Sequence, residues 1–169
     1  HGDDVTLIFD DDDYPAKTIL FGDKQLVQPV YEDEHFIIVN KPEGMKTHAN
    51  QPNELALLNH VSAYAGQTCY VVHRLDKDTS GLLIVAKNDV AHIKMSKEIQ
   101  DRLVKKIYIA LVKGNIPENE ATIDLPIARS TKDRKKMAVD EKGKNAVTHF
   151  KVLKRYDKYT LLELKIDTG

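Results

Sequence analysis

A polar loop in the middle of the chain carries the residue types best suited to chemistry. Residues 73–87 read His-Arg-Leu-Asp-Lys-Asp-Thr-Ser-Gly-Leu-Leu-Ile-Val-Ala-Lys, and the apolar runs 70–72 and 82–86 are expected strands. Functional side chains concentrate on loops between rigid strands. Asp76 is a candidate catalytic carboxylate, because carboxylates act as nucleophiles and the nearby cation of Arg74 would keep it ionised. An ordinary polar turn fits the composition as well.

The same loop partly matches a calcium-binding loop. Asp76, Asp78, Ser80 and Gly81 occupy its first, third, fifth and sixth positions. The twelfth position, however, is Lys87 where a bidentate Glu is needed, and the flanks read as strands rather than helices. We therefore expect no metal here.

The composition indicates one compact domain with a core, either alone or with a small appendage. The chain has 169 residues, of which 41% are hydrophobic. Its single cysteine, Cys69, leaves no internal disulfide or cysteine-based zinc site, which suits a reducing, cytoplasmic setting. No apolar run in the sequence is long enough to span a membrane, and we expect no membrane partner.

Charge is distributed unevenly along the chain. Residues 1–44 hold eleven acidic and three basic side chains, whereas residues 129–158 hold eleven basic and four acidic ones. This asymmetry favours nucleic-acid contact through the basic stretch. A lysine-rich surface that contacts only solvent is the alternative.

The apolar pattern predicts an α+β fold, with a mixed, mostly antiparallel β-sheet and flanking helices. Residues 28–40 read as strand, turn and strand, and residues 54–65 as a helix with Leu55 on its apolar face and Gly66 as its stop. A second helix is expected from Asn88, as N-cap, to about residue 101.

The remainder of the chain reads as strands. Over residues 105–114, Ile107, Ile109 and Leu111 share one face of an expected strand and Tyr108 lies on the other. From residue 121 onward the pattern is all-β. A further strand is expected at residues 5–9, ahead of an acidic linker.

Three motifs together indicate a family. His-Arg-Leu-Asp-x-x-Thr-Ser-Gly-Leu-Leu from residue 73, followed by Ala-Lys, resembles the central motif of the RluA/RluD-type RNA pseudouridine synthases. Asn-Lys-Pro-x-Gly-Met at residues 40–45 resembles the first motif of that family, and Lys-x-Tyr-x-Ala-x-Val-x-Gly at residues 106–114 resembles its later strand. Residues 1–13 are similar to the tail of an S4-like domain with an acidic linker, and residues 14–169 to the catalytic domain.

The resemblance implies an enzyme that isomerises specific uridines in RNA to pseudouridine without a cofactor. Large-subunit ribosomal RNA is the first expected substrate and tRNA the second. Asp76 would be the catalytic aspartate, either as a nucleophile or as a stabiliser of the sugar cation. Tyr108 would lie against the base and take a proton. Arg74 would fill the gap left by the flipped nucleotide, since the glycosidic bond is inaccessible inside a stacked helix.

Further RNA contacts are expected from basic side chains on either side of the motif. These are His73 and Lys41 near the loop, and Arg129, Lys135 and Lys136 in the basic stretch, which would hold phosphates. We expect the protein to act as a monomer.

One departure from the family pattern affects the expected activity. Members continue after a strand like that at residues 162–169 into an Arg-Thr-His-Gln-Ile-Arg segment, whose Arg pairs with the catalytic Asp. The present sequence stops just before such a segment. We therefore expect a fragment that lacks its C-terminal part and is itself inactive. A catalytically incompetent RNA-binding module of the same fold is the alternative.

Overall fold

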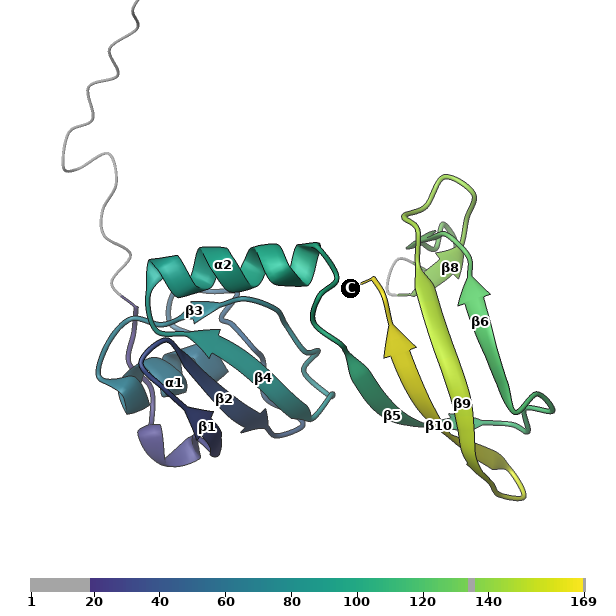
Figure 1. The fold of residues 1–169 in the computed structure, drawn as a ribbon, viewed down its shortest axis with the longest axis horizontal. Helices are drawn as coiled ribbons and strands as arrows, with labels where there is room; N and C mark the ends of the chain where they lie inside the picture. Colours follow the sequence, from purple (N-terminus) through teal and green to yellow (C-terminus); the bar gives the residue numbers. More distant parts are fainter. Residues whose placement is uncertain (1–18, 134–135, 169) are drawn as a thin grey trace, which may run out of the picture. The chain divides into compact units, whose positions relative to one another are not determined.

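The structure is a computed structural model that describes residues 19–133 and 136–168. The chain forms two compact units, His1–Lys97 and Glu98–Gly169, and the division falls within helix α2 (Asp89–Gln100). Antiparallel sheets and two α-helices make up the fold (Figure 1), which confirms the expected α+β class. The expected strand at residues 5–9 and the S4-like tail at 1–13 lie outside the described residues.

The first unit is built on a four-stranded antiparallel sheet. Its strands lie in the order β1 (Pro29–Glu32), β2 (Phe36–Lys41), β4 (Gly81–Ala86) and β3 (Tyr70–Val71). The expected hairpin at residues 28–40 is confirmed. The Asp33 carboxylate closes its turn by accepting from the backbone N–H groups of His35, at 2.8 Å, and Phe36, at 2.7 Å. These two hydrogen bonds lower the pKa of Asp33.

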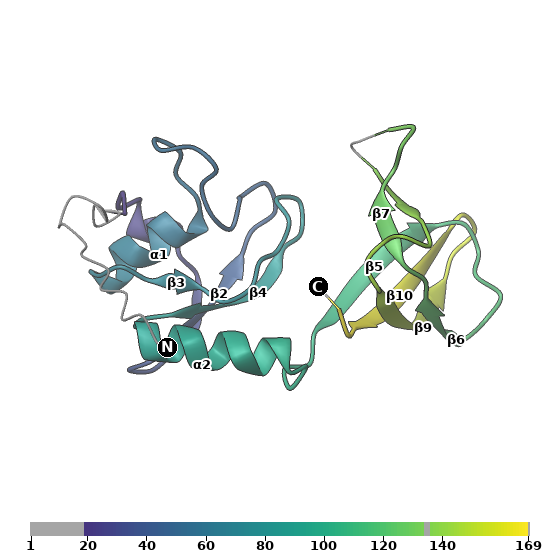
Figure 2. The same ribbon diagram turned by 90° about the horizontal axis from the view of Figure 1, so that it is seen from above.

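The core of this unit lies at the middle of the sheet. Ile37 pairs with Val85 and Val39 with Leu83, and all four side chains are fully buried. Alternate residues of a strand face the same side, so this register places all four on one face. Figure 2 shows helices α1 (Leu57–Ala65) and α2 on either side of strands β2, β3 and β4.

Helix α1 begins three residues later than the apolar pattern predicts. The backbone N–H groups of Leu57 and Leu58 donate to carbonyls of the preceding loop at 2.9 and 3.0 Å, and the Asn59 side chain accepts from the N–H of Ala56 at 2.9 Å. These bonds satisfy the first turn from outside the helix. Leu55 therefore precedes the helix and is 47% exposed, so its expected place on the buried face is wrong. Gly66 ends the helix at φ 67°, as predicted.

Helix α2 begins as its sequence predicts. The side-chain oxygen of Asn88 accepts from the N–H of Ala91 at 2.9 Å, which is the bond of an N-cap. Ala91 is buried in the helix, whereas Val90 and Ile93 are 77% and 68% exposed. No helix in the described part of the chain has the length and apolar character needed to cross a membrane.

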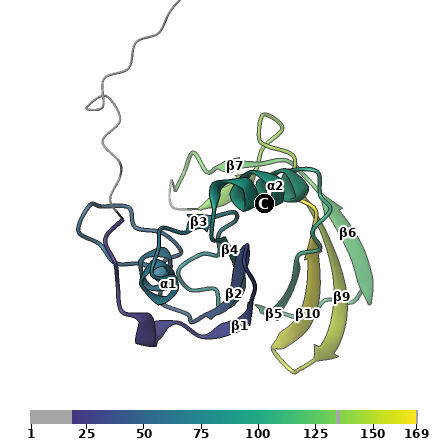
Figure 3. The same ribbon diagram turned by 60° about the vertical axis from the view of Figure 1, so that its left-hand side comes forward.

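The second unit is a separate four-stranded antiparallel sheet with an added hairpin (Figure 3). Its strands lie in the order β5 (Ile107–Lys113), β10 (Tyr159–Ile166), β9 (Val147–Arg155) and β6 (Glu120–Asp124). Strands β7 (Ile127–Arg129) and β8 (Met137–Val139) form the hairpin. The all-β character expected after residue 121 is confirmed.

Strand β5 alternates as predicted. Ile107, Ile109 and Leu111 share one face and are 58%, 61% and 59% exposed, while Tyr108 on the other face is half-buried. Tyr108 pairs across the sheet with Leu164. The larger apolar side chains of β5 are therefore on its more exposed face in this unit.

A lysine at the end of β2 lies inside the first unit. Lys41 is fully buried, and its ammonium donates to the carbonyls of Pro42 at 3.0 Å, Met45 at 2.7 Å and Lys77 at 3.1 Å. Burial lowers the pKa of Lys41, and the nearby carboxylates of Asp78 and Asp76 oppose that shift. Three acceptors satisfy all three N–H bonds of the ammonium, which makes its burial tolerable.

Replacing Lys41 by Met tests this arrangement. The volume is nearly kept, but three buried carbonyls lose their donor, so we expect the free energy of unfolding to fall by about 2–4 kcal/mol. Urea denaturation measures this change in the free energy of unfolding. Lys94→Met, on the exposed side of α2, is the matched control and should change stability by less than about 0.5 kcal/mol. Equal stability of the two variants would contradict the role assigned to Lys41.

Candidate active site

Within the loop between β3 and β4, one buried residue lies between two exposed ones. Leu75 is buried, with 6% of its surface exposed, whereas its neighbours Arg74 and Asp76 are both exposed. The loop is not a regular strand, yet residues 74–76 alternate between exposed and buried as they would in a strand. The candidate carboxylate and the candidate cation therefore both lie on the solvent side of this loop.

Three residues of the loop form hydrogen bonds with the rest of the first unit. His73 accepts a hydrogen bond on Nε2 from the N–H of Ile84 at 3.0 Å. The hydroxyl of Thr47 donates to the carbonyl of Leu75 at 2.7 Å and accepts from its N–H at 3.1 Å. Lys41 holds the carbonyl of Lys77.

These anchors lie on both sides of Asp76. A turn also follows it, in which the N–H of Thr79 donates to the carbonyl of Asp76 at 3.1 Å. The backbone around the carboxylate is thus held by bonds to Thr47 and Lys41 while its side chain stays exposed. A reactive group on a rigid support loses little freedom when a substrate binds, which is what positioning in a catalytic site requires.

Two residues expected to contact RNA have polar atoms that bind the protein's own backbone. The ammonium of Lys41 is fully buried against three carbonyls, so its position does not support a phosphate contact. The Nε2 atom of His73 is used by the backbone of β4. Sequence patterns did not reveal these contacts with the backbone, because lysine and histidine are also common on protein surfaces. Arg74, by contrast, is exposed, as is Asp76.

The other expected site residues belong to the second unit. Tyr108 lies in β5, Arg129 is exposed at the end of β7, and Lys136 is exposed with its ammonium 3.7 Å from a carboxylate oxygen of Asp133. Lys135 lies outside the described residues. The structure therefore groups Asp76 with Arg74, His73 and Lys41 in one unit and places Tyr108 in the other.

The second unit also holds a polar cluster that the sequence did not indicate. His149 lies with Nε2 2.8 Å from the carboxylate of Asp167 and Nδ1 2.8 Å from the hydroxyl of Thr122. The bond from His149 lowers the pKa of Asp167. Thr122 pairs with His149 across β6 and β9, and Asp167 directly follows β10, which pairs with β9. Among the described residues, no group of three or more His, Cys, Asp or Glu side chains is placed to hold a metal ion.

Comparison with known proteins covers most of the chain. The family described as RNA pseudouridylate synthase matches residues 35–169. The chain is 40% identical to the uncharacterized RNA pseudouridine synthase YlyB of Bacillus subtilis, over 99% of this chain and 57% of that protein. It is 45% identical to ribosomal large subunit pseudouridine synthase D of Pseudomonas aeruginosa, over 83% of this chain and 45% of that protein. The chain thus spans about half the length of these curated relatives.

A solved structure shows the same fold. Human RNA pseudouridylate synthase domain containing 1 superposes with a TM-score of 0.74 at 28% sequence identity, over 88% of this chain and 62% of that one. The family that the three motifs indicate is therefore confirmed by sequence comparison and by fold. The chain belongs to the RNA pseudouridylate synthase family.

Proposed function

We propose that the protein isomerises uridine in RNA to pseudouridine, with Asp76 as its catalytic residue. The observation that carries the proposal is the exposed pair of Arg74 and Asp76 on a loop anchored through His73, Leu75 and Lys77. Family membership supports the reaction class. The relative from Pseudomonas aeruginosa is named for the large ribosomal subunit, which supports ribosomal RNA as the first candidate substrate. Transfer RNA is the second.

The reaction conserves the atoms of the nucleotide. The bond between N1 of uracil and C1′ of ribose breaks, the base turns, and a bond forms between C5 and C1′, while the hydrogen on C5 leaves as a proton and N1 gains one. No external oxidant or reductant enters this balance. The carboxylate of Asp76 acts at C1′, either by bonding to it or by stabilising the positive charge that develops there.

The target uridine must leave the base stack before Asp76 can reach its sugar. Flipping costs a few kcal/mol, which a side chain that occupies the vacated space can offset. Arg74 is proposed for this role, because it is exposed and separated from Asp76 by one buried residue. Arg129 and Lys136, both exposed, are proposed to contact phosphates, as is Lys135. A cytoplasmic location and a monomeric state stay predictions from the sequence.

Substitution of Asp76 by Asn tests the catalytic proposal. The whole protein is incubated with RNA labelled with tritium at C5 of uridine, and released tritium is counted. Asp76→Asn should lower release by at least about 10³-fold, because an amide neither attacks C1′ nor stabilises its charge. RNA affinity should stay within a few-fold.

The loop offers its own control for this experiment. Asp78→Asn makes the same chemical change two residues away, at another exposed position, and should leave release nearly unchanged. Equal release by wild type and Asp76→Asn would refute the assignment of Asp76. No release by either, with RNA still bound, would favour the non-catalytic RNA-binding module.

Tyr108 is the proposed proton acceptor beside the base. Tyr108→Phe keeps the ring and removes the hydroxyl, so kcat should fall about 10²-fold while the dissociation constant for RNA changes less than twofold. Tyr159→Phe in β10, where the side chain is 46% exposed, is the matched control and should retain full kcat. Proton transfer through Tyr108 is ruled out if the two variants keep the same kcat.

A further inference from the structure

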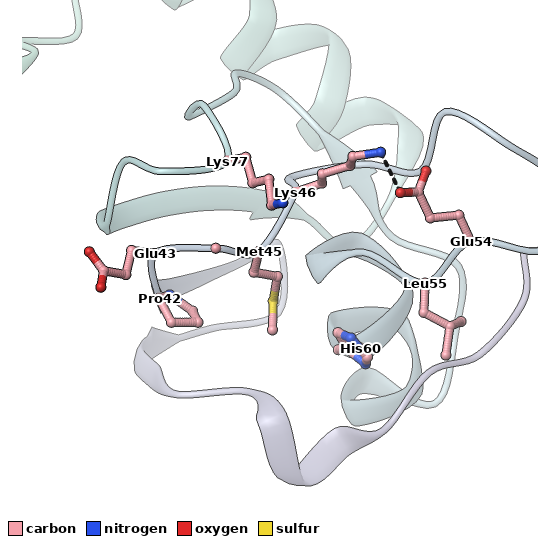
Figure 4. Close-up of a pocket in the computed structure, with 9 residues that line it drawn as sticks. Pro42, Glu43, Met45, Lys46, Glu54, Leu55, His60 and Lys77 are labelled. Carbon is pink, nitrogen blue, oxygen red and sulfur yellow. Dashed lines mark hydrogen bonds and ion pairs between the residues drawn. The ribbon is translucent and has the colours of Figure 1, made fainter.

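A pocket of about 620 Å³ lies in the first unit, next to the loop that carries Asp76 (Figure 4). Its wall combines the loop after β2, the segment before α1, His60 of α1 and Lys77. The volume lies in the range of sites that bind small molecules. Lys77 directly follows Asp76 in the chain, so one lining residue of the pocket is the sequence neighbour of the proposed catalytic residue.

The charges that line this pocket cancel. The lining holds two lysines, Lys46 and Lys77, and two glutamates, Glu43 and Glu54, and Lys46 forms an ion pair with Glu54 (Figure 4). Phosphate sites hold an excess of cationic donors. A balanced lining instead suits an uncharged, polar ligand.

The remaining wall suits a flat heterocycle. Figure 4 shows the apolar side chains of Met45 and Leu55 on either side of the His60 ring. Nδ1 of His60 accepts from the N–H of Asp23 at 2.8 Å, which leaves Nε2 of this mostly buried ring as its donor toward the pocket. A Cβ at Gly22 would lie 2.4 Å from Nδ1, so the close approach of that backbone also holds the ring.

Hydrogen bonds hold two walls of the pocket. Lys41 binds the carbonyls of Pro42 and Met45, and the N–H of Leu57 donates to the carbonyl of Lys46 at 2.9 Å. Two sides of the pocket are therefore tied to the sheet and to α1. Backbone that is already held by hydrogen bonds loses less conformational entropy when a ligand binds.

We propose that this pocket binds an unstacked base of the RNA substrate that neighbours the target uridine. The inference rests on the proposed function, because eversion of a uridine removes a stacking partner from the bases beside it. Unstacked RNA bases are recognised by contact with side-chain faces and by hydrogen bonds to their edges. Met45 and Leu55 provide the faces, and Nε2 of His60 provides a donor. The pocket thus selects the sequence around the target.

Methionine NMR tests this binding directly. The chain holds three methionines, Met45, Met95 and Met137, and only Met45 lines the pocket, so ¹³C-methyl labelling supplies the probe and two internal controls. Titration of the full chain with the dinucleotides UpA, UpC, UpG and UpU should move the Met45 methyl signal upfield through the ring current of a base. Inorganic phosphate and ribose 5-phosphate should not move it.

The outcomes separate this inference from the proposed function, because the titration needs no turnover. A stationary Met45 signal with all four dinucleotides refutes the pocket, even where Asp76→Asn abolishes tritium release. An equal shift with inorganic phosphate also refutes it and indicates an anion site. A base-dependent shift supports the pocket whether or not Asp76 proves catalytic.

Steady-state kinetics of the whole protein give a second test. Leu55→Glu places a carboxylate in the pocket at a position that is 47% exposed, and should raise KM for RNA about tenfold. Val90→Glu introduces the same charge on α2, 77% exposed and outside the pocket lining, and should leave KM unchanged. Identical KM values for the two variants would overturn the inference.

Discussion

The buried ammonium of Lys41 is the interaction on which the candidate site depends. A charge inside a protein is tolerated only where fixed dipoles replace the water it has lost. Here three carbonyls do so, two from the loop after β2 and one from the loop that carries Asp76. Because the buried ammonium needs all three carbonyls as acceptors, two irregular segments far apart in sequence are held together at one point. Lys41, the last residue of β2, thus holds two loop segments that belong to no sheet or helix.

The exposed positions of Arg74 and Asp76 follow from this anchoring. With Leu75 buried and bound on both its N–H and its carbonyl by Thr47, the residues on either side of it can only face outward. The loop therefore needs no regular strand to place a cation and a carboxylate on one side. Long loops tend to be mobile, and hydrogen bonds from this loop to Thr47, Lys41 and β4 restrict its backbone.

Sequence reasoning succeeded where a pattern is local and failed where contacts are distant. The hairpin before Lys41, the Asn88 cap and the stop at Gly66 each rest on residues within a few positions, and all three are confirmed. Leu55 was misplaced because carbonyls of the preceding loop, and not its own pattern, decide where α1 begins. The cluster of His149 with Asp167 was missed because only strand register brings them together. Motif identity, in contrast, indicated the family, since it depends on residue order alone.

The same ammonium connects the proposed base pocket to the proposed catalytic loop. Lys41 binds the carbonyl of Met45, whose side chain lines the pocket, and the carbonyl of Lys77, which follows Asp76. A base that settles against Met45 therefore acts on a segment that shares a hydrogen-bonded centre with the backbone of the aspartate. Binding energy from a non-reacting part of a substrate accelerates a reaction only when it orders the reacting groups. Because Lys41 binds the carbonyls of both Met45 and Lys77, we expect a base bound against Met45 also to order the backbone next to Asp76. Sequence recognition and catalysis would then be linked through one side chain.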